Sequence, residues 1–265
     1  MKTYKQVFLE LKEQNRAALI PFFVIGDPDF DTSVRIVKTA IDAGADVLEL
    51  GIPFSDPIAD GPTIQKADIR AMKSGLNMAK ALEFIKKLKH YKDVPIGLLM
   101  YYNLVYQYGT EKFFNDFHLA GVNSVLVADL SIDDADEIVG PATSAGLDTV
   151  FMVTPVTSYE RMKLIASKTT GFIYTVSLLG VTGSREKLSD TVEAMVGKLK
   201  KLTSVPVCVG FGISKPEHAA AIAQAGADGV IIGSKIVAMI ENNMDDKEKM
   251  LAEISTFLSK VKSAI

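Results

Sequence analysis

One short phrase, Ala-Gly followed by any residue and then Asp or Asn, occurs four times and constrains the fold more than any other feature. Each copy follows a segment with helical spacing of apolar residues and leads directly into a short apolar run. The glycine suits the left-handed position that ends a helix. Strands without polar alternation are typical of a parallel sheet covered by helices. The copies occupy residues 43–46, 120–123, 145–148 and 225–228.

Four further apolar segments fill the gaps and bring the number of predicted strands to eight. Residues 1–16 are typical of a short amphipathic helix, and Thr110, Ser158 and Ser214 are expected to cap later helices. The predicted strands are residues 18–25, 47–50, 94–100, 124–127, 149–153, 172–176, 206–210 and 229–232. The predicted helices are residues 32–43, 79–90, 111–120, 159–167, 190–202, 216–225 and 247–261.

Regular alternation of strands and helices to the end of the chain predicts an α/β fold. A closed (β/α)8 TIM barrel and an open doubly wound sheet both fit the pattern. The 265 residues match a barrel of about 250. No Gly-x-Gly-x-x-Gly opens a first turn, which weakens the dinucleotide-binding version of the open sheet. We expect one domain over residues 1–265, a barrel preceded by an extra N-terminal helix.

Composition excludes several classes of function. Cys208 is the only cysteine and cannot form an internal disulfide, which fits a reduced, cytoplasmic setting. The three histidines lie in predicted helices and lack metal-ligand spacing. A net charge of −3 provides no overall basic surface, which argues against nucleic acid as a partner. The first residues are too charged for a signal peptide, and no apolar run could span a bilayer.

Glu49 is the strongest catalytic candidate. Active sites of barrels lie where strands end and the following loops begin. Alternation along residues 47–51 directs Glu49 to the interior of an otherwise apolar strand. It could pair there with a lysine or arginine, but no cation lies nearby in sequence. Desolvation would raise the pKa of its carboxyl, which suits a general acid near neutral pH.

The loop after this strand, residues 51–62, carries three prolines and the carboxylates Asp56 and Asp60. Asp, Gly and Pro are ordinary turn residues, so the loop could be a solvated turn. Phe54 and Ile58 are unusual in such a turn and suggest that something packs on it.

Glycine-bearing segments follow the sixth, seventh and eighth predicted strands, at residues 180–184, 210–214 and 233–235. Glycine often only makes a turn, but three such segments at adjacent strand ends favour a phosphate site. Carbon–carbon cleavage beside such a site can use a strand lysine, a metal or carboxylates. The predicted strands contain no lysine and the histidines are elsewhere, so acid–base chemistry by carboxylates remains.

Residues 48–65 resemble the signature of the tryptophan synthase α-subunit family. Further matches lie at residues 99–103, 180–183, 210–214 and 233–234, and the similarity runs from the first strand to the last helix. The resemblance implies a lyase that splits indole-3-glycerol phosphate into indole and glyceraldehyde 3-phosphate in tryptophan biosynthesis. It implies no cofactor or metal in this chain and an αββα heterotetramer with a β-subunit, which carries pyridoxal phosphate and receives indole through a tunnel.

The resemblance also implies roles for residues. Glu49 would protonate indole C3 and serve the side-chain hydroxyl, Asp60 would stabilise charge at the indole nitrogen, and Tyr174 would orient the substrate. Thr182 would reach Asp60 on closure, and Asp56 would face the β-subunit. The phosphate would be held, beside Phe211, by backbone groups of Gly183, Gly212, Gly233 and Ser234. The indole would be enclosed by Phe22, Leu99, Tyr101 and Leu126. Packing in the core could explain these four side chains equally well.

The sequence departs from the family pattern at two places, which lie in regions that the family uses for lid closure and β-subunit contact and not at Glu49 or Asp60. Ser131 stands where the family often has proline, and Leu178 and Leu179 stand where many members carry a polar residue.

Other interpretations of the function stay open: another phosphate-binding barrel such as an isomerase or indole-3-glycerol-phosphate synthase, a stand-alone lyase that releases indole, or a non-catalytic activator of the β-subunit. Intact Glu49 and Asp60 argue against the last.

Overall fold

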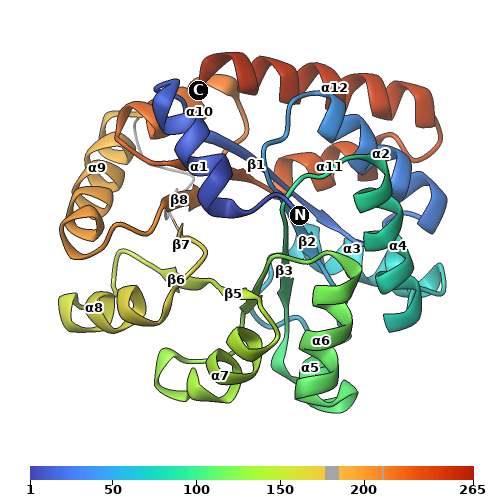
Figure 1. Ribbon diagram of the computed structural model, residues 1–265. Helices are drawn as coiled ribbons and strands as arrows, with labels where there is room; N and C mark the ends of the chain where they lie inside the picture. Colours follow the sequence, from blue (N-terminus) through green and yellow to red (C-terminus); the bar gives the residue numbers. More distant parts are fainter. Residues whose placement is uncertain (177–184, 211) are drawn as a thin grey trace.

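The computed structural model describes residues 1–176, 185–210 and 212–265, with side chains given outside residues 177–191 and 211. Within these residues, nine parallel strands form a nearly closed barrel surrounded by helices (Figure 1). The strand order is β5-β4-β3-β2-β1-β9-β8-β7-β6. The strands are β1 (Ala18–Val24), β2 (Leu48–Gly51), β3 (Ile96–Met100), β4 (Ser124–Val127), β5 (Asp148–Thr149), β6 (Phe151–Val153), β7 (Ile173–Val176), β8 (Val207–Gly210) and β9 (Gly229–Ile232).

The barrel confirms the closed alternative, with one correction at residues 149–153. This segment, expected as one strand, forms two, because β5 pairs with β4 while β6 pairs with β7. Only Val150 separates them, and its N–H donates to the Val125 carbonyl at 3.0 Å. Strands of a barrel are staggered, so successive parts of one strand meet different neighbours. The two ends of the sheet are therefore adjacent in sequence, and the ring closes there.

The recurring phrase of Ala, Gly, any residue and then Asp or Asn has two structural roles. All four of its glycines, Gly44, Gly121, Gly146 and Gly226, have positive φ, as a helix-ending residue requires. In three copies the polar residue then accepts a backbone N–H of the adjacent strand. Asp46 accepts from Leu19 at 2.7 Å, Asn123 from Ile96 at 3.0 Å and Asp228 from Val207 at 2.8 Å. The phrase thus ends a helix and fixes the start of the neighbouring strand.

The described helices are α1 (Tyr4–Glu13), α2 (Phe30–Asp42), α3 (Pro62–Lys73), α4 (Met78–Tyr91), α5 (Tyr102–Tyr108), α6 (Thr110–Ala120), η1 (Ile132–Asp134), α7 (Asp136–Ser144), α8 (Tyr159–Lys168), α9 (Arg185–Leu202), α10 (Pro216–Gln224), α11 (Ser234–Asn242) and α12 (Lys247–Ala264). None of them is both long and apolar enough to cross a membrane. The sequence patterns missed α3, α5, η1, α7 and α11.

Of the three expected helix caps, Ser158 is confirmed, since its side chain accepts from the Arg161 N–H. Thr110 is wrong because it is already the first residue of α6, which follows Gly109. Ser214 is wrong because Pro216 begins α10, so that Lys215 is the cap. Proline suits a first helical position, where its missing N–H leaves no bond unmade.

Helix α1 closes the amino-terminal end of the barrel (Figure 1). Its buried face packs Tyr4 and Phe8 against the barrel interior, and the Tyr4 ring meets Phe172 edge-on at 5.6 Å. The Tyr4 hydroxyl and Ser124 Oγ lie 2.8 Å apart, within hydrogen-bond distance. Since the aromatic side chains of α1 fill this end of the barrel interior, the interior space that remains for a ligand lies at the carboxyl ends of the strands.

Candidate active site

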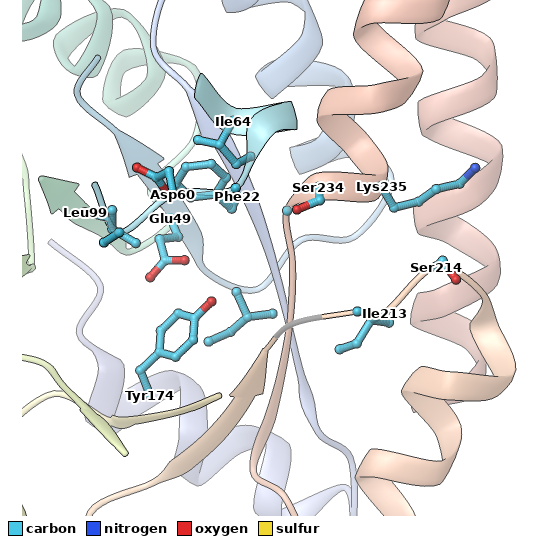
Figure 2. Close-up of a pocket in the computed structure, with 15 residues that line it drawn as sticks. Phe22, Glu49, Asp60, Ile64, Leu99, Tyr174, Ile213, Ser214, Ser234 and Lys235 are labelled. Carbon is cyan, nitrogen blue, oxygen red and sulfur yellow. The ribbon is translucent and has the colours of Figure 1, made fainter. Parts of the chain in front are cut away.

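A cavity of about 290 Å³ opens at the carboxyl ends of the strands (Figure 2). It is lined by residues from β1, β2, β3, β7 and β9 and from the loops that follow β2, β8 and β9. Of the residues chosen from sequence, it brings together Phe22, Glu49, Asp60, Leu99, Tyr174, Gly212, Gly233 and Ser234.

Glu49 faces this cavity from β2. The neighbouring Leu48 and Leu50 belong to the core between strands and helices, whereas Val47 packs in the barrel interior, as the alternation predicts. Glu49 is only 3% exposed, and its Oε2 has no hydrogen-bond partner among the described residues. Burial, and then the charge of Asp60, raises the pKa of Glu49 to about 8. No described lysine or arginine forms an ion pair with Glu49, so the alternative of an internal salt bridge is not supported.

Asp60 is held from behind by a tyrosine. The Tyr101 hydroxyl donates to Asp60 Oδ2 at 2.6 Å and accepts the Ala59 N–H at 3.0 Å. The Phe54 ring stacks on Tyr101, with centroids 5.1 Å apart. Burial raises the pKa of Asp60, although the Tyr101 hydrogen bond opposes the rise. The loop after β2 therefore holds the Asp60 carboxyl group in place. Stacking of Phe54 on Tyr101 explains why this loop contains an aromatic residue. Ile58, by contrast, is 82% exposed.

Tyr174 reaches from β7 toward Glu49 (Figure 2). Burial, and then the carboxyls of Glu49 and Asp60, raise its pKa, so the hydroxyl stays protonated. Gly210 on the adjacent strand makes room for it, because a Cβ at residue 210 would lie 2.6 Å from the Tyr174 oxygen. A tyrosine hydroxyl can donate to one ligand atom and accept from another.

The opposite end of the cavity is formed by Gly212, Ser214, Gly233 and Ser234. Ser234 begins α11, and within the described residues the N–H groups of Ser234 and Lys235 have no backbone acceptor. Such free N–H groups at a helix start, together with the helix dipole, favour an anion. Gly233 also leaves room for a side chain, since a Cβ there would meet Phe22 at 3.2 Å.

The remaining expected residues lie elsewhere. Tyr101 is 2% exposed and stands behind Asp60, while Leu126 is buried in the interior cluster and lines a different cavity. Asp56 is exposed on the loop after β2. Thr182, Gly183 and Phe211, and the departures Leu178 and Leu179, lie outside the described residues. Ile64, Ile213 and Lys235 also line the cavity and were not chosen, although each stands inside or beside a motif that pointed to the site.

Helix α3 carries the end of the Asp60 loop and is fixed by a buried ion pair. Arg70 donates to both oxygens of Asp27, at 2.6 and 2.9 Å, and Asp27 is 1% exposed. The nearby Asp68 is 4% exposed, and burial, then Asp60 and Asp27, raise its pKa to about 8. Among the described residues, no group of His, Cys, Asp and Glu side chains has the arrangement of a metal site.

This geometry suits one kind of ligand. An apolar pocket with a protonatable carboxyl and a second carboxyl lies at one end, and the backbone N–H groups of Ser234 and Lys235, which have no acceptor among the described residues, lie at the other. A molecule with a flat apolar body and an anionic tail fits both ends. Protonation of that body by Glu49 would create positive charge that Asp60 could stabilise.

The comparisons of sequence and of structure with known proteins agree on one family. The model of the family described as tryptophan synthase alpha chain matches residues 8–265. A tryptophan synthase alpha chain of Methanothermobacter thermautotrophicus is 42% identical over 262 residues, covering 99% of this chain and 96% of the relative. The crystal structure of tryptophan synthase subunit alpha from Legionella pneumophila, 31% identical, superposes with a TM-score of 0.91 over 100% of this chain and 98% of its own. A tryptophan synthase complex from Pyrococcus furiosus contains a chain 37% identical, with a TM-score of 0.82 over 91% and 97% of the two chains.

Proposed function

The chain belongs to the tryptophan synthase alpha chain family, a family of carbon–carbon lyases in tryptophan biosynthesis, and we propose that its cavity performs the family's cleavage of indole-3-glycerol phosphate with Glu49 and Asp60 as the catalytic pair. The observation that carries the proposal is the buried Oε2 of Glu49 at the wall of the cavity, which has no hydrogen-bond partner in the part of the chain that the structure describes. An acid with a pKa of about 8 holds its proton at neutral pH and can still give it up.

Glu49 transfers its proton to C3 of the indole ring. The ring then carries positive charge at its nitrogen, which the Asp60 carboxylate stabilises, accepting the N–H proton in part or in full. The bond between C3 and the glycerol carbon breaks, its electrons restore the aromatic ring, and the indole nitrogen takes back from Asp60 any proton that it had given up. The hydroxyl on that carbon gives its proton to the Glu49 carboxylate and becomes the aldehyde of glyceraldehyde 3-phosphate. Glu49 ends the cycle protonated.

Other residues position the substrate. Tyr101 holds one oxygen of Asp60 and leaves the other for the indole nitrogen. Tyr174, whose hydroxyl lies on the Glu49 side of the cavity in Figure 2, orients the substrate carbon that reacts beside Glu49. Phe22 and Leu99 pack on the ring, and Leu126 supports that pocket from the interior. The backbone of Gly212, Gly233 and Ser234 holds the phosphate. Thr182, Gly183 and Phe211, for which the family resemblance implies further roles, lie outside the described residues.

A β-subunit is the partner in this proposal. The Pyrococcus furiosus structure is described as a tryptophan synthase complex. Asp56 and the exposed Ile58 lie on the loop after β2 and form the face that meets the β-subunit in an αββα assembly. Pyridoxal phosphate belongs to the β-subunit, the α reaction uses no cofactor, and both subunits work in the cytoplasm. In this role residues 1–265 act as one domain.

The test is release of indole from indole-3-glycerol phosphate, with and without β-subunit. We expect weak activity alone and strong stimulation by the partner. Glu49→Gln and Asp60→Asn each lose at least about 100-fold, as general acid–base groups do. Glu83→Gln, a matched change at an exposed position of α4, keeps full activity.

Unchanged turnover in Glu49→Gln would remove Glu49 as the acid. Absence of indole release by the wild-type chain, with stimulation of the β-subunit retained, would instead make the chain a non-catalytic activator.

A further inference from the structure

A second cavity, of about 470 Å³, lies between α10, α11 and α12 and adjoins the catalytic one. Ser214 and Lys235 line both cavities, so the two share a wall at the phosphate end of the site. Figure 2 shows Lys235 extending from the start of α11 in the direction away from Glu49. The proposed function makes no use of this second space.

The second cavity is strongly cationic. Four lysines line it, with a single carboxylate, Glu253. Lys249 lies 3.9 Å from Glu253, which also accepts a hydrogen bond from Asn243 at 3.0 Å. Within the described residues, the ammonium groups of the remaining three have no ion pair or hydrogen bond. These three are Lys215, Lys235 and Lys260.

Solvated surface lysines are common, and the arrangement of these three sets them apart. Lys235 is half-buried and lies on the wall between the two cavities, which places its charge beside the phosphate end of the catalytic site. The three charges come from three separate parts of the chain and gather at one hollow, where they repel each other. An anion in the hollow would relieve this repulsion. The floor, formed in part by Met239 and Phe257, gives such an anion a low-dielectric wall that strengthens the field.

We propose that this cavity is an outer anion subsite, which receives the phosphate of the substrate before it passes to the backbone N–H groups of Ser234 and Lys235. The inference rests on the proposed function, because it takes the anion to be the phosphate of indole-3-glycerol phosphate. Lys235, which borders both cavities, passes the phosphate from the outer subsite to the inner one. A clustered field of this kind raises the association rate of an anionic ligand by roughly 10- to 1,000-fold, and salt screens it.

The test compares Lys215→Gln/Lys235→Gln/Lys260→Gln with Lys5→Gln/Lys12→Gln/Lys92→Gln. The control removes the same charge from exposed positions on α1 and just after α4, near the amino-terminal end of the barrel. Steady-state cleavage is measured with β-subunit at low and high ionic strength. At low ionic strength we expect kcat/KM of the first variant to fall about tenfold below that of the control. In high salt the two should agree within about twofold. Replacing Lys235→Gln by Lys235→Arg in the first variant, which returns a positive charge to this position, should recover part of the loss.

Equal kcat/KM for the two variants at low ionic strength would overturn the outer subsite and leave the proposed function standing on wild-type indole release. Should the wild-type chain release no indole, calorimetric binding of inorganic phosphate to the same variants decides the matter. About tenfold weaker binding in the first variant at low salt supports the subsite, and equal binding refutes it.

Discussion

Replacing Glu49 by glutamine should stabilise the fold, by an amount that grows with pH. The Glu49 carboxyl has a pKa of about 8 when folded, against an ordinary value of 4.5 that the unfolded chain restores. The folded state therefore holds a proton that the unfolded state releases, and wild-type stability falls as pH rises between these values. Glutamine has nearly the same shape and carries no ionisable proton, so the variant escapes this loss.

The size of the effect follows from the pKa difference. Each pKa unit corresponds to about 1.4 kcal/mol, so the wild type should be less stable than Glu49→Gln by about 3 kcal/mol at pH 7 and about 5 kcal/mol above pH 8. Below pH 4.5 the two should agree within about 1 kcal/mol, because both side chains are then neutral. For a chain of this size, about 3 kcal/mol corresponds to a rise in Tm of roughly 6–12 °C.

Urea unfolding of both proteins at pH values from about 4.5 to 9, with Glu83→Gln as the exposed control, measures this difference. The control loses only an exposed ion pair between Glu83 and Lys87, so it should match the wild type within about 0.5 kcal/mol at each pH. A difference between wild type and Glu49→Gln that stays constant across the range would refute the reasoning, since it would show that folding does not shift the Glu49 proton. The gain in stability accompanies loss of cleavage, as expected where an active site keeps an unfavourable group for its chemistry.

Three further predictions concern the same site. The kcat/KM for cleavage should decline above about pH 8, where Glu49 loses its proton; a decline already complete at about pH 6 would contradict the assignment of the acid. Tyr101→Phe removes the 2.6 Å hydrogen bond that opposes the raised pKa of Asp60, so turnover should fall about tenfold at about pH 6 and less at about pH 8; equal losses at both values would argue against a charge effect. Gly51→Ala places a methyl group 2.8 Å from the Phe22 ring and should destabilise the fold by about 1–3 kcal/mol in urea unfolding while raising KM; a wild-type KM would show that Phe22 is not held in place by this contact.

Much of the fold could be predicted because its signals are local. A glycine with positive φ ends each helix of the recurring phrase, and that preference belongs to the residue itself. Where the local signal is weak, the prediction failed. The sequence patterns missed α3, α5, α7 and α11 because these helices are short or begin directly at strand-end motifs, where residues that serve the site interrupt the apolar spacing. The false caps, Thr110 and Ser214, arose because Gly109 and Pro216 decide where those helices begin.

The candidate site was only partly predictable. Alternation along β2 was enough to direct Glu49 inward, and the motifs marked the glycine-bearing loops. The support of Asp60 by Tyr101 could not be predicted, because residues 41 apart meet only when β3 lies beside the loop that follows β2. The same applies to the cationic cavity, whose lysines approach one another only when α10, α11 and α12 pack together.

The sequence by itself therefore determined the kind of protein: alternating helices and buried strands, with an acidic side chain at one strand end and phosphate-type loops at others. These follow from periodicity and from residue preferences that act over a few positions. The tertiary structure alone decided where the ring closes, around Val150, and that no described cation neutralises Glu49. Closure and electrostatic isolation depend on which distant segments become neighbours, and a raised pKa depends on the water and charges that those neighbours exclude.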